Sequence, residues 1–116
     1  MNHVIVRLVM QPSKVVSRFR PHYEQAQKWL DNEVVKDCTP YVPMDTGRLM
    51  NSGIEATNYG SGEVVYNTPY AAKCYYNKLN FSKDKHPQAQ SRWFEKAKSV
   101  NKDKWVNGVT KIMEGA

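Results

Sequence analysis

Residues 19–37 read FRPHYEQAQKWLDNEVVKD, and this stretch decides the fold. Its apolar positions recur every three or four residues, at Phe19, Tyr23, Ala26, Leu30 and Val34. That spacing places them on one face of an α-helix, which can pack against a core. Pro21 fits the first turn of a helix capped by Ser17, or of one that starts at Pro21, because first-turn amides have no intrahelical acceptor. The helix should end near Asp37, ahead of an extended proline loop at Thr39 to Pro43.

Segments on both sides of this helix have the composition of β-strands. Asn2 to Val9 reads NHVIVRLV, is rich in β-branched residues and stops shortly before a proline, so it predicts a strand. Gly53 to Asn58 and Glu63 to Asn67 flank Tyr59-Gly60-Ser61-Gly62, whose two glycines favour a turn. We therefore expect a β-hairpin over residues 53–67.

The C-terminal half predicts further helices. Pro69 suits the first position of a short helix reaching Tyr76, and Asn77 to Pro87 is polar enough to be an exposed loop. The later apolar positions keep helical spacing in two groups, Trp93, Ala97 and Val100, then Trp105, Val109 and Ile112. The two groups are out of phase around Asn101 to Asp103. This slip predicts either one kinked helix or two helices, the second capped by Asn101.

Together these elements predict an α+β protein with one domain over residues 1–116. A small, mostly antiparallel sheet, made of the N-terminal strand plus the hairpin, is packed by the long N-terminal helix and by the C-terminal helices. The length, 116 residues, is enough for a single modest core. No apolar run approaches the length that a membrane-spanning helix needs, so we expect an aqueous location and no membrane partner.

The charge distribution leaves a nucleic-acid-binding protein open as an alternative. The formal net charge is +6, which suggests an anionic partner, although the cations are spread through the chain and interleaved with Asp and Glu, apart from a loop around Lys78, Lys83 and Lys85. In that alternative the phosphate-binding residues would be Lys78, Lys83, Lys85 and Arg92, and the base-stacking residues would be Tyr75, Tyr76, Phe81 and Trp93. Because tyrosine and tryptophan also fill cores and subunit interfaces, we favour packing or interface roles for Tyr70, Tyr75, Tyr76 and Trp93.

No catalytic, cofactor or metal site is predicted. Cys38 and Cys74 are not spaced as metal ligands, and the three histidines are scattered. Asp45-Thr46-Gly47 matches the triplet that supplies the carboxylate of aspartic proteases, but Pro43 and Arg48 do not fit the strand and small residue that flank the triplet there. A capped turn, in which Asp45 accepts amide hydrogen bonds and Gly47 allows a tight bend, fits better.

Several short motifs occur here in the order found in one family. Tyr41-Val42-Pro43-Met44-Asp45-Thr46-Gly47-Arg48-Leu49, followed by Ser52, resembles the VP-x-DTG-x-L-x-x-S stretch of minor capsid proteins from tailed bacteriophages and prophages. The likeness continues at Val65 to Ala71, at Tyr75-Tyr76 and at Pro87 to Lys98, which reads PQAQSRWFEKAK. The resemblance covers most of the chain, and the end of the long helix, Asp31 to Cys38, also takes part in it.

The resemblance implies a structural virion protein and no enzymatic activity. Related neck and tail-completion proteins share the proline loop and the Asp-Thr-Gly-x-Leu turn, so it implies a subunit of a ring, six-fold or twelve-fold, that joins the head to the tail. The implied partners are further copies of the chain and phage proteins on the portal or adaptor side and on the tail side, in the virion after assembly in the host cytoplasm. Asp45, Thr46, Gly47, Arg48 and Leu49 would set a turn or a contact. Lys78, Lys83 and Lys85 would form a loop facing DNA or a partner.

Overall fold

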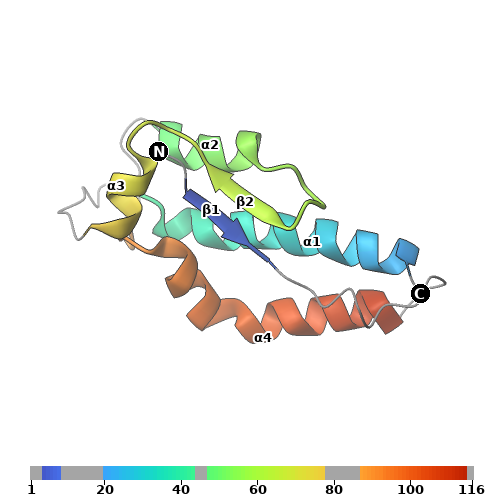
Figure 1. Cartoon of the computed structure of the whole chain (residues 1–116). Helices are drawn as coiled ribbons and strands as arrows, with labels where there is room; N and C mark the ends of the chain where they lie inside the picture. Colours follow the sequence, from blue (N-terminus) through green and yellow to red (C-terminus); the bar gives the residue numbers. More distant parts are fainter. Residues whose placement is uncertain (1–3, 9–19, 44–46, 78–86, 115–116) are drawn as a thin grey trace.

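The computed structural model describes residues 4–8, 20–43, 47–77 and 87–114 (Figure 1). In chain order its elements are β1 (Val4–Arg7), α1 (Arg20–Cys38), the 3₁₀ turn η3 (Thr39–Tyr41), α2 (Arg48–Ala56), β2 (Glu63–Tyr66), α3 (Ala71–Tyr76) and α4 (Trp93–Glu114). The α+β class and the long N-terminal helix predicted from the sequence are confirmed. No helix within the described ranges is long and apolar enough to cross a membrane.

The sheet consists of β1 and β2, which pair antiparallel with Ile5 opposite Val65. The side chains alternate between two faces: Val4 is buried at 1% exposure whereas Ile5 is 46% exposed. On the exposed face Arg7 forms a cross-strand ion pair with Glu63, at 3.0 Å between Nε and Oε2. The small sheet thus turns one face to the core and the other to solvent.

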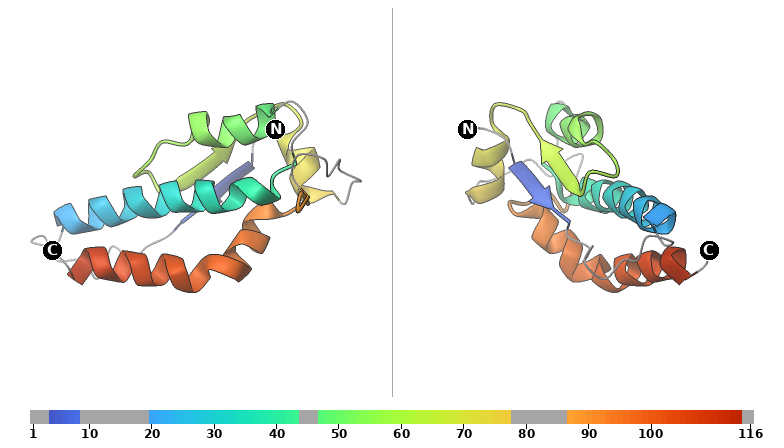
Figure 2. Two further views of the ribbon diagram at one scale, coloured as in Figure 1. Left: turned by 180° about the vertical axis from the view of Figure 1, so that it is seen from behind. Right: turned by 45° about the vertical axis from the view of Figure 1, so that its right-hand side comes forward.

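Helices cover the buried face of this sheet. The longest, α1 and α4, run side by side, while α2 packs against β2 (Figures 1 and 2). Gly108 of α4 meets the ring of Trp29 so closely that a Cβ atom there would overlap it. Trp105 Nε1 donates to Asp37 Oδ2 at 2.7 Å, and Lys104 Nζ contacts the same oxygen at 2.7 Å. A small residue and a polar cluster therefore fix α4 along α1.

The predicted hairpin over residues 53–67 is wrong. Its first arm is helical, since α2 continues to Ala56, and β2 pairs with the N-terminal strand instead. Gly53 explains the difference, because its bare backbone faces the ring of Tyr66, where a side chain would collide. Gly53, which the sequence pattern places at the start of a strand, is here the small residue that lets a helix approach the sheet.

The remaining elements differ from expectation in smaller ways. Thr39 to Pro43 is not a fully extended loop, because it begins with the turn η3 and becomes extended at Val42. The C-terminal region is one helix that bends after its first turns, as Figures 1 and 2 show, so the kinked alternative is the one observed. Asn101 lies inside this helix, where its side chain donates to the carbonyl of Ala97 at 3.0 Å, and it caps no second helix.

Candidate interaction surface

The Asp-Thr-Gly turn is described only from Gly47 onward, and Asp45 and Thr46 lie outside the described residues. Gly47 has a φ of 87°, in the left-handed region that favours glycine, and its carbonyl accepts from the Asn51 amide at 2.9 Å. Leu49 is buried, whereas Arg48 is exposed. The bend at Gly47 thus directs Leu49 into the core and Arg48 outward, and a contact role for Arg48 stays a prediction.

The candidate aromatic residues separate into a buried and an exposed group. Trp93 is fully buried and meets Tyr75 and Tyr66 edge to face, at ring-centroid distances of 4.7 and 5.3 Å. Burial raises the pKa of both Tyr75 and Tyr66. These three rings therefore belong to the core, which removes Tyr75 and Trp93 from the set of residues that could stack on bases.

The exposed group lies around α3. Tyr76 is 56% and Tyr70 37% exposed, and the guanidinium carbon of Arg92 lies 5.4 Å from the centroid of the Tyr76 ring. We call Tyr70, Tyr76 and Arg92 the aromatic end, since α3 stands at the opposite end of the molecule from the C-terminus (Figure 1). Arg92 itself has a φ of 50°, an uncommon value for a residue other than glycine. Amphipathic rings with an adjacent arginine are the composition that protein interfaces favour.

The cation cluster predicted in the Asn77 to Pro87 loop cannot be placed. Lys78, Lys83, Lys85 and Phe81 lie outside the described residues. Of the residues proposed for nucleic-acid contact, only Tyr76 and Arg92 are both described and exposed. The DNA-facing or partner role of the lysines stays a prediction.

Cys38 is buried beside the aromatic core, and its desolvation raises the pKa of the thiol to about 12. Cys74 is half-buried, and burial raises its thiol pKa as well. Both cysteines are free, and the described residues contain no group of three side chains that could hold a metal ion. Thiols of this kind react slowly, which fits structural rather than chemical roles.

Sequence reasoning missed Asp31, the most tightly held polar side chain of α1. It is fully buried, and its Oδ2 accepts from the amides of Gly60 and Gly62 at 2.8 and 2.9 Å. Its Oδ1 accepts from Gln27 Nε2 at 2.9 Å. The carboxylate therefore fixes the turn before β2. The sequence contained one hint, an acidic residue inside the otherwise apolar face of the helix.

Comparisons with known proteins give one family. The model of the minor capsid protein family matches residues 6–113, nearly the whole chain. No curated protein matches, and neither does any solved structure.

Proposed function

The chain belongs to the minor capsid protein family of phages, which gives it a structural role in the virion, and from this premise we propose that it joins head to tail. It would do so as a non-enzymatic neck component, forming a ring with further copies of itself between portal-side and tail-side proteins. The observation that carries this proposal is the family match over residues 6–113 together with the aromatic end. A subunit of such a ring needs two different contact faces, one for each neighbour.

The aromatic end supplies one contact face of the proposed ring. Tyr70 precedes α3 and Tyr76 ends it, and both rings are exposed, while α3 itself lies at the opposite end of the molecule from the C-terminus (Figure 1). The edge-to-face contact between Tyr75 and Tyr76, with centroids 5.0 Å apart, holds the exposed ring against a buried one. A rigid anchor of this kind loses little conformational entropy when a partner binds it.

The test is a stop codon early in the gene of the parent phage or induced prophage, followed by negative-stain microscopy. We expect heads and finished tails that accumulate separately, because the joint between them is missing. Supplying the intact gene on a plasmid should restore joined particles. Normal infectious virions in the absence of the protein would contradict the proposal.

A second experiment asks whether the aromatic end is the contact. Complementation with Tyr70→Ala/Tyr76→Ala should leave unjoined heads, whereas Val100→Ala, an equally exposed apolar truncation on α4, should restore joining. Circular dichroism of both purified variants checks that they fold. Full complementation by the double tyrosine variant would remove the aromatic end from the joint and leave the family role intact.

A further inference from the structure

The two outer edges of the sheet differ in the hydrogen bonding of their outward-facing backbone groups. On β2 the outward amide of Val65 donates to Thr57 Oγ1 at 3.0 Å, so the chain itself occupies that edge. On β1 the Leu8 amide donates to Gly62 O at 2.6 Å, which sets the alternation of the ladder. The backbone groups of Val4 and Val6 then face β2, and those of Ile5 and Arg7 face away from it. Within the described residues no strand pairs with that side of β1.

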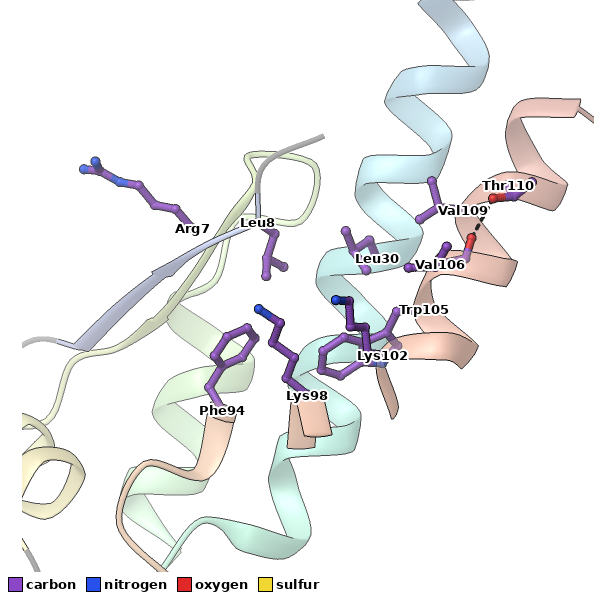
Figure 3. A pocket seen from close by; sticks show the side chains of 10 residues that line it. All are labelled: Arg7, Leu8, Leu30, Phe94, Lys98, Lys102, Trp105, Val106, Val109 and Thr110. Atoms are coloured by element: carbon purple, nitrogen blue, oxygen red, sulfur yellow. Dashed lines mark hydrogen bonds between the residues drawn. The ribbon is translucent and has the colours of Figure 1, made fainter. Parts of the chain in front are cut away.

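An apolar groove runs between this edge and α4. Its volume is about 360 Å³, and its walls are formed by Leu8, which directly follows β1, by Leu30 from α1 and by a row of α4 residues (Figure 3). The apolar part of the α4 row is Phe94, Trp105, Val106 and Val109. Val106 keeps 53% of its surface exposed, so part of the apolar wall is open to solvent. Backbone groups that face away from the ladder and an apolar groove thus lie next to each other.

The rim of the groove is positively charged. Arg7, Lys98 and Lys102 line it, and among the described residues no acidic side chain does. Arg7 already contacts Glu63 on the exposed face of the sheet. In Figure 3 the Lys98 and Lys102 side chains extend from α4 along the groove, on the side facing β1. A ligand in this groove would therefore gain from carrying carboxylates.

We propose that the edge of β1 binds an extended segment of a neighbouring protein, which adds to the sheet as a third strand. Its backbone would pair with Ile5 and Arg7, alternate apolar side chains would enter the groove, and acidic residues would meet Lys98 and Lys102. Strand addition of this type gains affinity from main-chain hydrogen bonds and specificity from side-chain pockets. The net charge of +6 argues that the segment comes from a different, more acidic protein rather than from a second copy. The proposal does not depend on a place in the neck.

Hydrogen exchange of the full chain followed by NMR tests the edge directly. In the protein alone the amides of Ile5 and Arg7 should exchange quickly, while those of Val6 and Leu8 are protected by β2. Slow exchange at Ile5 and Arg7 in the monomer would mean that the chain already covers this edge, and it would overturn the proposal.

Synthetic peptides test the ligand chemistry. An acetylated eight-residue peptide of alternating valine and glutamate should bind and slow exchange at Ile5 and Arg7. The same peptide with N-methyl groups on every second residue keeps the side chains but cannot pair along that edge, so it should not bind. Equal binding of both peptides would show a groove without strand addition, and failure of the first peptide to bind would also overturn the proposal.

Paired charge reversals locate the contact. Lys98→Glu/Lys102→Glu should weaken binding of the acidic peptide by about tenfold and should improve binding of a valine–lysine peptide. The matched control is Lys28→Glu/Lys111→Glu, which makes the same charge change at exposed lysines outside the groove and should have little effect. An equal loss of peptide binding in both double variants would show that the effect comes from net charge alone. Binding of a single-stranded oligonucleotide in place of the peptide would assign the lysines to nucleic acid instead.

Discussion

At the scale of single residues, the buried carboxylate of Asp31 holds together two parts of the fold, although Asp31 is less conspicuous in the sequence than the aromatic residues. A helix side chain here completes a turn that lies about thirty positions later, by accepting two glycine amides. Gly62 has a φ of 81°, so the turn combines a left-handed glycine with a charged acceptor. This arrangement fixes where β2 begins and so which of its residues meet β1.

Replacement of Asp31 by asparagine tests this role. Asp31→Asn keeps the shape, but its amide nitrogen must face a donor, so we expect a loss of about 1–3 kcal/mol in the free energy of unfolding. Urea denaturation measures the change. Asp103→Asn, which alters an exposed carboxylate on α4, is the control and should stay within about 0.5 kcal/mol of the parent. Equal stability of Asp31→Asn and the parent would show that the turn at Gly60 to Gly62 does not depend on the carboxylate.

Gly47 offers a second test at this scale. Because its φ of 87° is costly for residues with a Cβ atom, Gly47→Val should lose at least about 1–2 kcal/mol and lower the melting temperature. Gly47→Asn should lose less, since asparagine tolerates the left-handed region. Thermal unfolding followed by circular dichroism measures the melting temperatures of the parent and the two variants and so gives their order of stability. A Gly47→Val variant with the same melting temperature as the parent would refute the left-handed turn at Gly47.

At the scale of elements, most helices and the N-terminal strand could be predicted because their periodicity is local. The helix over residues 19–37 was found within a residue or so of its observed start and end. The C-terminal phase slip left one kinked helix or two helices open, and the first of these is observed. Patterns of this kind report the face that a segment buries, whatever it packs against.

The segment 48–56 could not be predicted, because tertiary contacts override its local preference. It contains Asn51, Ser52 and Gly53, all poor helix formers. Its helix is stabilised by burial of Leu49 and by the fit of Gly53 under the Tyr66 ring, which a distant strand supplies. The candidate aromatic residues divide similarly, because the sequence could not tell Trp93, in the core, from Tyr76, on the surface.

The packing of α4 on α1 gives a prediction at this scale. In an exposed helix Gly→Ala is normally stabilising, but the added methyl of Gly108→Ala would meet Trp29, so we expect a loss of about 1–3 kcal/mol. Asn107→Ala, one position earlier and exposed, should be neutral or stabilising. Chemical denaturation compares them. If Trp29→Leu in the same chain restores stability, the collision is the cause, and a stabilised Gly108→Ala would refute close packing.

At the scale of the whole molecule, the buried ionisable groups predict sensitivity to alkali. The pKa of Cys38 is raised from 9.0 to about 12, and burial raises that of Tyr66 and Tyr75 as well. These groups are neutral when protonated, so the folded state holds their protons more tightly than the unfolded state. The contribution of Cys38 is complete below its unfolded pKa of 9.0 and is lost as the pH rises to about 12. The contribution of the two tyrosines begins to fall only above their unfolded pKa of 10.0.

The melting temperature should therefore be nearly constant from pH 7 to pH 8.5 and should fall steeply above pH 9. Differential scanning calorimetry across this range measures the decline. Cys38→Ala removes one of the three groups, so its curve should fall less steeply, although packing loss lowers its value at pH 7. A melting temperature that is unchanged at pH 11 would show that the thiol and phenols are solvated.

The occupied outer edge of β2 has a consequence for colloidal behaviour. Exposed strand edges on both sides of a sheet let molecules polymerise without limit, which is the origin of many fibrils. Here the hydroxyl of Thr57 accepts a hydrogen bond from the Val65 amide, which a further strand would need as a donor, so growth in that direction is opposed. Loss of that hydroxyl, as in Thr57→Val, would leave an amide without its acceptor at a second edge. A single threonine thus removes one of the backbone donors through which fibrillar growth at this edge would proceed.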